Sequence, residues 1–258
     1  MAASRADAVD PDVTRVLTLA IQFDREGKFL AACNMYTEGI NLLFKSIKSA
    51  KDANTRSALT ARAKQYLDRA ELLKKQVEDA KQKPQGYHEQ ILIEDGAVGY
   101  GLETVFIPYI DSELTEVQID DPYIRANHQI HMFLRFCALL VKHARQLRVI
   151  RLKTSCGQQS PEAKTAQMMR LEEMKAGLLR HNVSLVLQYS ETLHDREIRF
   201  NNGWLIKIGR GLDYFKRPEG ENNIDYFELD FRPCHSTTID IVFKGPAGNQ
   251  PAGSSKTK

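Results

Sequence analysis

The spacing of apolar residues changes from one period to another along this 258-residue chain, near residues 84–87. Before that point apolar side chains recur every three or four residues, as on one face of a helix. After it, short stretches alternate with a spacing of two, as on a strand. The polar segment 81–86 contains one proline and one glycine, which is typical of a linker. The pattern predicts a first domain at 8–83, a linker at 84–87, a second domain at 88–244 and a disordered tail at 245–258.

The first domain is predicted to consist of three amphipathic helices. Their expected bounds are 12–25, 28–49 and 55–82. Asp10 followed by Pro11 has the residue types of an N-cap and a first helical position. Each helix must bury its apolar stripe, so three of them joined by short connections form an antiparallel bundle.

A second face of the predicted third helix carries Leu67. Leu67 follows Tyr66 of the apolar stripe by one residue, and it therefore lies about 100° around the helix from it. Lys64, Glu71 and Lys75 share the flank of Leu67, at spacings of three and four residues. Two interpretations stay open here: Leu67 widens the buried stripe, or it lies in a shallow groove that receives another helix.

The second and third helices also carry a family resemblance. Residues 65–74, QYLDRAELLK, closely resemble the third-helix signature of MIT domains (microtubule-interacting and trafficking), and residues 28–36 resemble the start of the second helix. The resemblance implies a three-helix bundle that binds the C-terminal tails of ESCRT-III subunits, the charged multivesicular body proteins. It also implies that a partner helix docks between the second and third helices, with Leu67 as its apolar anchor and Asp68 and Glu71 facing basic partner residues.

The second domain alternates strands and helices along the chain. Strands are predicted at 90–93, 115–120, 147–152, 183–189, 225–231 and 238–243, and helices at 102–110, 124–143 and 161–180. Asn202-Gly203 lies between two alternating apolar runs, which is a strong short-range signal for a hairpin. Strand–helix–strand order requires crossover connections. We therefore expect an α+β two-domain protein whose second domain is α/β, with a largely parallel central sheet made mixed by the hairpin.

Composition argues against several classes of function. The net charge is +3, with +4 in residues 1–86 and −1 in residues 87–258, so nucleic acid is not an expected partner. No apolar run approaches the roughly eighteen residues of a membrane span. The N-terminus lacks an apolar signal core, so a cytoplasmic protein is expected. The four cysteines form no C-x-x-C pair, and reduced thiols are expected in place of a zinc site or disulfides.

The stretch 194–215 contains the only Trp and the densest cluster of His, Arg, Asp and Gly. If residues 194–200 form a strand, His194 and Arg196 share a face, because side chains alternate across a strand. A nucleophilic His beside a cation that holds phosphate oxygens suits phosphoryl transfer.

Adjacent carboxylates at Asp120 and Asp121 end another predicted strand. They are candidate metal ligands. Two carboxylates directly before Pro122 more often cap a turn, and no metal site is therefore expected.

The spacing after His194 resembles the phospholipase D motif H-x-K-x-x-x-x-D, with Arg196 and Asn201 at the other two positions. Arg still binds phosphate, but Asn carries neither the charge nor the proton of the acid. The chemistry needs two such motifs, and this chain has one. The three residues are therefore vestigial candidates, and we expect a protein that is not an enzyme and needs no cofactor. The alternative is a phosphodiesterase, of phospholipase D or nuclease type, that pairs His194 from two chains of a dimer.

Nearly the whole chain, apart from the tail, is similar to a family that joins an MIT domain to a phospholipase-D-like domain. In the second domain the similarity lies in residues 121–125, 194–215 and 232–235. The resemblance implies a homodimer through that domain, without known activity, that binds acidic, phosphoinositide-containing membranes. It further implies recruitment by ESCRT-III to midbody and late endosome membranes, and a role in cytokinetic abscission.

Four cations after the predicted hairpin are candidates for membrane contact: Lys207, Arg210, Lys216 and Arg217. Each Lys or Arg near anionic lipid contributes on the order of 1 kcal/mol, and Arg196 and Arg199 add to the group. An alternative stays open, namely a solvated, salt-bridged surface, because three acidic residues are close in the sequence: Asp213, Glu219 and Glu221.

Overall fold

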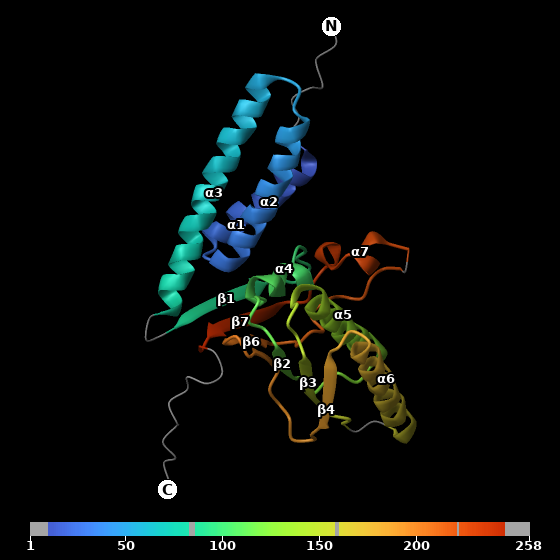
Figure 1. The fold of residues 1–258 in the computed structure, drawn as a ribbon. Helices are drawn as coiled ribbons and strands as arrows, with labels where there is room; N and C mark the ends of the chain where they lie inside the picture. The colour runs from blue at the N-terminus through green and yellow to red at the C-terminus, as the bar shows by residue number, and fades with distance from the viewer. Residues whose placement is uncertain (1–9, 83–85, 158–159, 221, 246–258) are drawn as a thin grey trace. The chain divides into compact units, whose positions relative to one another are not determined.

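A computed structural model of the protein describes residues 10–82, 86–157, 160–220 and 222–245. The chain divides into two compact units, and the division falls between Pro84 and Gln85 (Figure 1). The first unit contains three helices and the second a seven-stranded sheet with helices. Residues 84 and 85 of the predicted linker lie outside the described residues, as do residues 246–258 of the predicted tail.

The first unit is the three-helix bundle that the apolar stripes predict. Its helices are α1 (Pro11–Arg25), α2 (Phe29–Ser49) and α3 (Ala53–Lys81). The Asp10 carboxylate accepts a backbone N–H of the first turn of α1 at 3.0 Å. The Asp52 carboxylate caps α3 in the same way at 2.7 Å. Each cap satisfies a backbone donor that has no partner within its helix.

Close packing of α1 on α2 occurs where α2 has no side chain. A Cβ at Gly39 would lie 2.4 Å from the Leu17 side chain, so a larger residue would force Leu17 to shift. On another side of α2, the rings of Tyr36 and Tyr66 stack with their centroids 5.7 Å apart. The core of the bundle therefore lies between α2 and each of its two neighbours.

The second unit is built on one mixed sheet with the strand order β1-β7-β6-β5-β2-β3-β4. The strands are β1 (Tyr87–Ile93), β2 (Glu116–Asp120), β3 (Val149–Thr154), β4 (Ser184–Tyr189), β5 (Glu197–Phe200), β6 (Trp204–Ile208) and β7 (Thr237–Phe243). Only β2–β3 and β3–β4 are parallel. The expectation of a largely parallel sheet was therefore wrong, because the short turn between β5 and β6 enforces antiparallel pairing and β7 and β1 extend that half.

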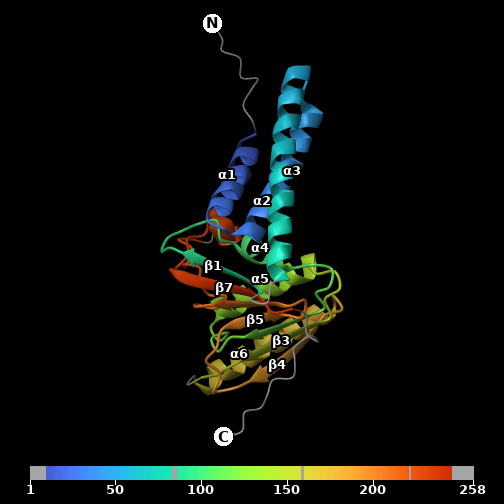
Figure 2. The ribbon, with the colours of Figure 1, turned by 90° about the vertical axis from the view of Figure 1, so that its left-hand side faces the viewer.

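Two crossover helices cover one face of the sheet. They are α5 (Asn127–His143) and α6 (Pro161–Leu179), and they lie on the same face because β2, β3 and β4 are added in one direction with right-handed connections (Figure 2). A shorter helix, α4 (Leu102–Phe106), continues as the 3₁₀ helix η1 (Ile107–Tyr109). The register aligns four buried isoleucines in one row across four strands: Ile119, Ile198, Ile206 and Ile241.

The segment predicted as a strand at 225–231 is instead α7 (Ile224–Phe227) followed by the 3₁₀ helix η2 (Leu229–Phe231). Two guanidinium groups account for the difference. Arg135 of α5 and Arg232 each donate two hydrogen bonds, of 2.6–3.0 Å, to backbone carbonyls of residues 225–227. These carbonyls are thereby satisfied without a neighbouring strand.

Candidate functional site

The flank of α3 that carries Leu67 is exposed. Leu67 is 43% exposed, and Lys64, Asp68 and Glu71 around it are exposed as well. Ala63 beside it is buried. Leu67 therefore does not widen the buried stripe of α3 but forms an apolar point, beside a small side chain, within charged surroundings.

The flank of Leu67 faces away from α1. Arg69, two residues further along α3, reaches α1, and two residues span about 200° of a helix. On α2, Gly39 packs against α1 and Phe44 lies about 140° around from it, by the same geometry. Phe44 is 48% exposed. The α2–α3 flank, defined here by Phe44 and Leu67, thus presents an exposed apolar side chain from each helix.

Sequence reasoning found Leu67 and missed Phe44, although the signal was the same. Leu67 directly follows the stripe residue Tyr66, and Phe44 directly follows the stripe residue Leu43. An apolar residue one position beyond a buried stripe residue lies about 100° outside the stripe. Both positions therefore fall at the margin of the core.

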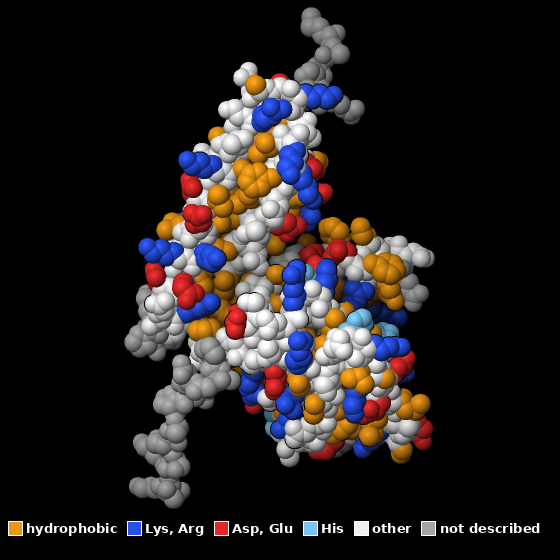
Figure 3. Space-filling model, viewed as in Figure 1, with side chains coloured by type: hydrophobic (Ala, Val, Ile, Leu, Met, Phe, Trp, Pro, Cys, Tyr) orange, Lys and Arg blue, Asp and Glu red, His pale blue; other side chains and the backbone are white. Residues whose placement is uncertain are grey.

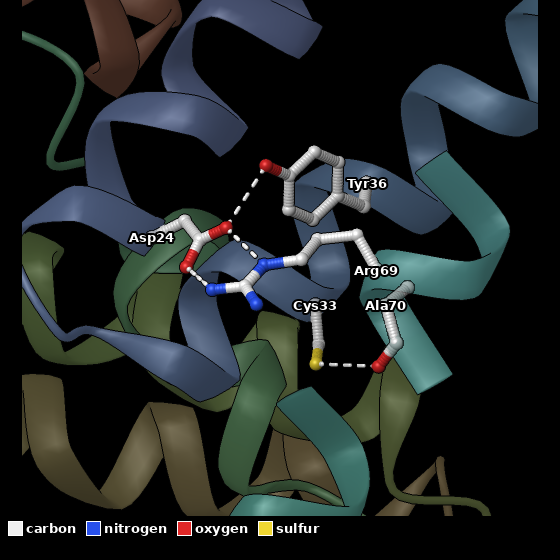
Figure 4. Close-up of polar contacts among 5 residues, drawn as sticks. All are labelled: Asp24, Cys33, Tyr36, Arg69 and Ala70. Atoms are coloured by element: carbon white, nitrogen blue, oxygen red, sulfur yellow. Dashed lines mark hydrogen bonds and ion pairs between the residues drawn. The ribbon is translucent and has the colours of Figure 1, made fainter. Parts of the chain in front are cut away.

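An ion pair joins α1 to α3 on the side of the bundle opposite the α2–α3 flank (Figure 4). Arg69 donates from Nε and Nη2 to the two oxygens of Asp24, at 2.7 and 2.6 Å. The Tyr36 hydroxyl donates to Asp24 at 3.1 Å, and the Cys33 thiol donates to the Ala70 carbonyl at 3.4 Å. Each of the three helices contributes to this network, so it fixes how α3 is turned about its axis.

The same network shifts three pKa values. The hydrogen bonds from Arg69 hold the pKa of the Asp24 carboxyl below its usual range. Burial raises the pKa of Tyr36 to about 12, and burial also raises the pKa of Cys33 to about 11. At neutral pH the network therefore contains a carboxylate, a guanidinium, a neutral phenol and a neutral thiol.

In the second unit the structure separates His194, Arg196 and Asn201. Strand β5 begins at Glu197, so His194 lies in the preceding loop, where it is exposed. The expected strand over 194–200 was therefore too long. His194 and Arg196 do not share a strand face.

Arg196 is already engaged within the fold. Its Nη1 donates to the Gly209 carbonyl at 2.8 Å, and its guanidinium lies 4.0 Å from the centre of the Tyr123 ring. Arg125 lies 5.1 Å from the same ring. These contacts tie the loop before β5 to the carboxyl end of β2.

Asn201 is held by hydrogen bonds to the start of β2. Its Oδ1 accepts the backbone N–H groups of Thr115 and Glu116, both at 3.0 Å. Its Nδ2 donates to the Thr115 hydroxyl at 2.7 Å. Asn201 lies beyond the last residue of β5, whereas His194 precedes the first. The side chain thus joins the end of β5 to the start of β2.

The two adjacent carboxylates have separate partners. Asp120 forms an ion pair with Arg199 at 2.9 Å. Asp121 accepts the backbone N–H of Tyr123 at 2.9 Å, which makes the capped turn that the sequence favoured, and burial raises its pKa. Within the described residues, no group of three or more His, Cys, Asp and Glu side chains is placed to hold a metal ion.

The candidate membrane cations divide into two pairs. Lys207 pairs with Glu197 at 3.4 Å and Lys216 pairs with Asp95 at 2.6 Å. Arg210 and Arg217 are exposed, and neither has an ion-pair partner in the described part of the chain. Arg199 forms ion pairs with Asp120 and Glu197. The salt-bridged alternative therefore applies to the two lysines, whereas the two arginines have side chains that are free to contact a membrane.

Comparison with known proteins identifies both units. Residues 14–75 match the MIT (microtubule interacting and transport) domain, and residues 99–243 match the phospholipase D-like domain found at the C-terminus of MIT. The chain belongs to this family of two-domain MIT proteins. It is 46% identical over 226 residues to MIT domain-containing protein 1 of Mus musculus, a similarity that covers 88% of this chain and 90% of that protein. None of the described helices has the length and apolar character needed to cross a membrane.

Replacing Asp24 with Asn should weaken the bundle selectively. Because the pKa of Asp24 is depressed in the folded state, its contribution is present above its unfolded pKa of about 4 and is lost as the pH falls through the folded value. The side chain of Arg69 is 40% exposed, so after allowance for solvent screening we expect a loss of about 1 kcal/mol at neutral pH. Stability below about pH 4 should change less.

Chemical denaturation followed by far-ultraviolet circular dichroism measures this effect. The only tryptophan, Trp204, lies in β6, so its fluorescence reports the second unit and should not change. Asp79→Asn, an exposed carboxylate on α3, is the matched control. An Asp24→Asn variant as stable as the unaltered protein at neutral pH would refute the role of the ion pair.

Proposed function

We propose that this protein is a non-enzymatic adaptor between ESCRT-III and membranes. Its MIT domain binds the C-terminal tails of ESCRT-III subunits. Its phospholipase-D-like domain forms a homodimer and contacts anionic, phosphoinositide-containing membrane, and the protein acts in cytokinetic abscission at the midbody. The observation that carries the proposal is the α2–α3 flank, where Leu67 is exposed among charged residues.

The chemistry of the α2–α3 flank suits an amphipathic helix. Separate apolar side chains of the partner pack on Leu67 and on Phe44, which are 43% and 48% exposed. Basic partner residues pair with Asp68 and Glu71, which lie about 100° and 40° around α3 from Leu67. Lys64, in the preceding turn of α3, pairs with an acidic residue of the partner. Such a binding mode combines apolar anchors with a charged rim, and it requires no movement of the core.

Two weak contacts in one dimer give strong attachment. A dimer carries two MIT domains and two sets of the unpaired cations Arg210 and Arg217. When one contact forms, the second occurs at high effective concentration, so the avidity exceeds either single affinity. This supports an adaptor that acts only where ESCRT-III and anionic lipid are found together.

The phosphodiesterase alternative gains little support from the geometry. Nucleophilic attack by His194 on a phosphodiester needs a nearby cation that is free to hold the phosphate oxygens. Arg196 instead donates to the Gly209 carbonyl and stacks on Tyr123. Asn201, at the position of the acid, is used to join β2 and β5.

Leu67→Asp should weaken tail binding at least tenfold, because it places a charge against the apolar anchor of the partner. Fluorescence polarisation with labelled peptides from the C-terminal tails of ESCRT-III subunits measures the Kd. Leu72→Asp is the matched control, since Leu72 is 48% exposed on the same helix but about 140° around from Leu67. Equal affinities for the Leu67→Asp variant and the unaltered protein would rule out this flank.

The double variant Arg210→Gln/Arg217→Gln should bind anionic vesicles about thirtyfold less tightly, because two unpaired cations contribute on the order of 2 kcal/mol. Co-sedimentation with phosphoinositide-containing vesicles measures the effect. The control variant Lys207→Gln/Lys216→Gln removes cations that are already paired and should show a smaller loss. The opposite order of effects would show that membrane contact lies elsewhere.

Phosphodiesterase activity should be absent from both the unaltered protein and the His194→Ala variant. Release of nitrophenolate from a chromogenic phosphodiester is the measurement. Activity in the unaltered protein that disappears in His194→Ala would establish the enzymatic alternative.

A further inference from the structure

A groove of about 900 Å³ lies between α5 and α6, on a different surface from the α2–α3 flank. Its lining residues recur at helical spacing along both helices, from Asn127 to Lys142 on α5 and from Arg170 to His181 at the end of α6. Fifteen residues of α5 correspond to about 22 Å. The groove is therefore elongated along the two helices.

The floor of this groove is apolar and shallow. Ile130, Met174 and Leu178 form its buried base, and Leu134 projects into it with 43% of its surface exposed. Ala138 of α5 and Gly177 of α6 also line the groove, and each contributes little or no side chain. A Cβ at Gly177 would have no neighbour closer than the tip of Arg180, at 3.8 Å. Ala138 is exposed, and the Arg180 guanidinium is the group within contact distance of Gly177.

The rim of the groove is mainly basic. Lys142, Arg170 and Arg180 line it together with His131 and His181, against the single acidic residue Glu173. Lys142 is paired with Glu103 at 2.8 Å. Arg170 and Arg180 have no ion-pair partner within the described residues. In Figure 3, orange, blue and pale blue side chains lie together on the part of the surface that α5 and α6 form.

These features select among possible occupants. A second copy that docked through the same groove would place one basic rim against another, and like charges in contact are unfavourable. A bilayer presents a broad, flat surface, whereas this groove is concave and bounded by two parallel helices. A helix with an apolar face and acidic flanks matches the floor, the rim and the length together.

We propose that the α5–α6 groove binds an acidic amphipathic helix of a partner protein, about four turns long. Leucine-type side chains of the partner pack on Leu134 and over Gly177. Its carboxylates pair with Arg170 and Arg180. This second docking site would let the phospholipase-D-like domain recruit a protein independently of the MIT domain.

The test uses the full-length chain carrying Leu67→Asp, so that the α2–α3 flank does not contribute. The probes are three fluorescein-labelled peptides of about sixteen residues: an amphipathic Leu/Glu helix, its Leu/Lys counterpart and a scrambled Leu/Glu sequence. The Leu/Glu helix should bind at least tenfold more tightly than the other two. Ala138→Glu should weaken its binding at least tenfold, because it fills the floor and adds a negative charge.

Charge reversal gives a gain of function. The double variant Arg170→Glu/Arg180→Glu should no longer bind the Leu/Glu peptide and should bind the Leu/Lys peptide more tightly than the unaltered groove does. Met169→Glu is the matched control, since Met169 is 68% exposed on α6 and does not line the groove. Trp204 fluorescence confirms that each variant stays folded.

Three outcomes would overturn the proposal. The first is equal binding of the three peptides. The second is vesicle binding that is lost in Ala138→Glu when no peptide binds, which would assign the groove to a lipid surface. The third is a change of oligomeric state in Ala138→Glu by analytical ultracentrifugation, which would show that a second copy covers the groove.

Discussion

The second domain depends on the pairing of β2 with β5, which joins a parallel half of the sheet to an antiparallel half. Asn201 secures one end of this pairing with three side-chain hydrogen bonds. At the other end, Arg199 bridges Asp120 and Glu197. Asn201 and Arg199 therefore hold the two halves of the sheet together.

The first domain has a different requirement, since the apolar side chain of Leu67 must stay exposed without being drawn into the core. The Asp24–Arg69 ion pair attaches one side of α3 to α1. Leu67 is thereby turned outward on the opposite side, with 43% of its surface exposed. The orientation of one helix about its axis is thus set by polar contacts, because the apolar stripe alone would tolerate a rotation that buries Leu67.

Local patterns were sufficient for some features and insufficient for others. The three helices of the bundle, the crossover helices and the β5–β6 hairpin follow from spacing, caps and the Asn-Gly turn, all of which act within a few residues. The strand order depends on pairings between distant segments, such as β1 with β7, and periodicity does not encode them. The prediction of a strand at 225–231 was wrong because Arg135, some ninety residues earlier, donates hydrogen bonds to the backbone carbonyls of this segment. The α5–α6 groove needs two helices placed side by side, and neither helix reveals it alone.

Strand β1 has a consequence for where the second domain begins. The family match covers residues 99–243, yet β1 (Tyr87–Ile93) pairs along its whole length with β7. A fragment that starts at residue 99 would leave β7 as an edge strand, with unpaired backbone groups beside the buried Ile239 and Ile241. Exposed edges of this kind attract other strands and promote aggregation. The second unit therefore begins at β1, before the start of the family match.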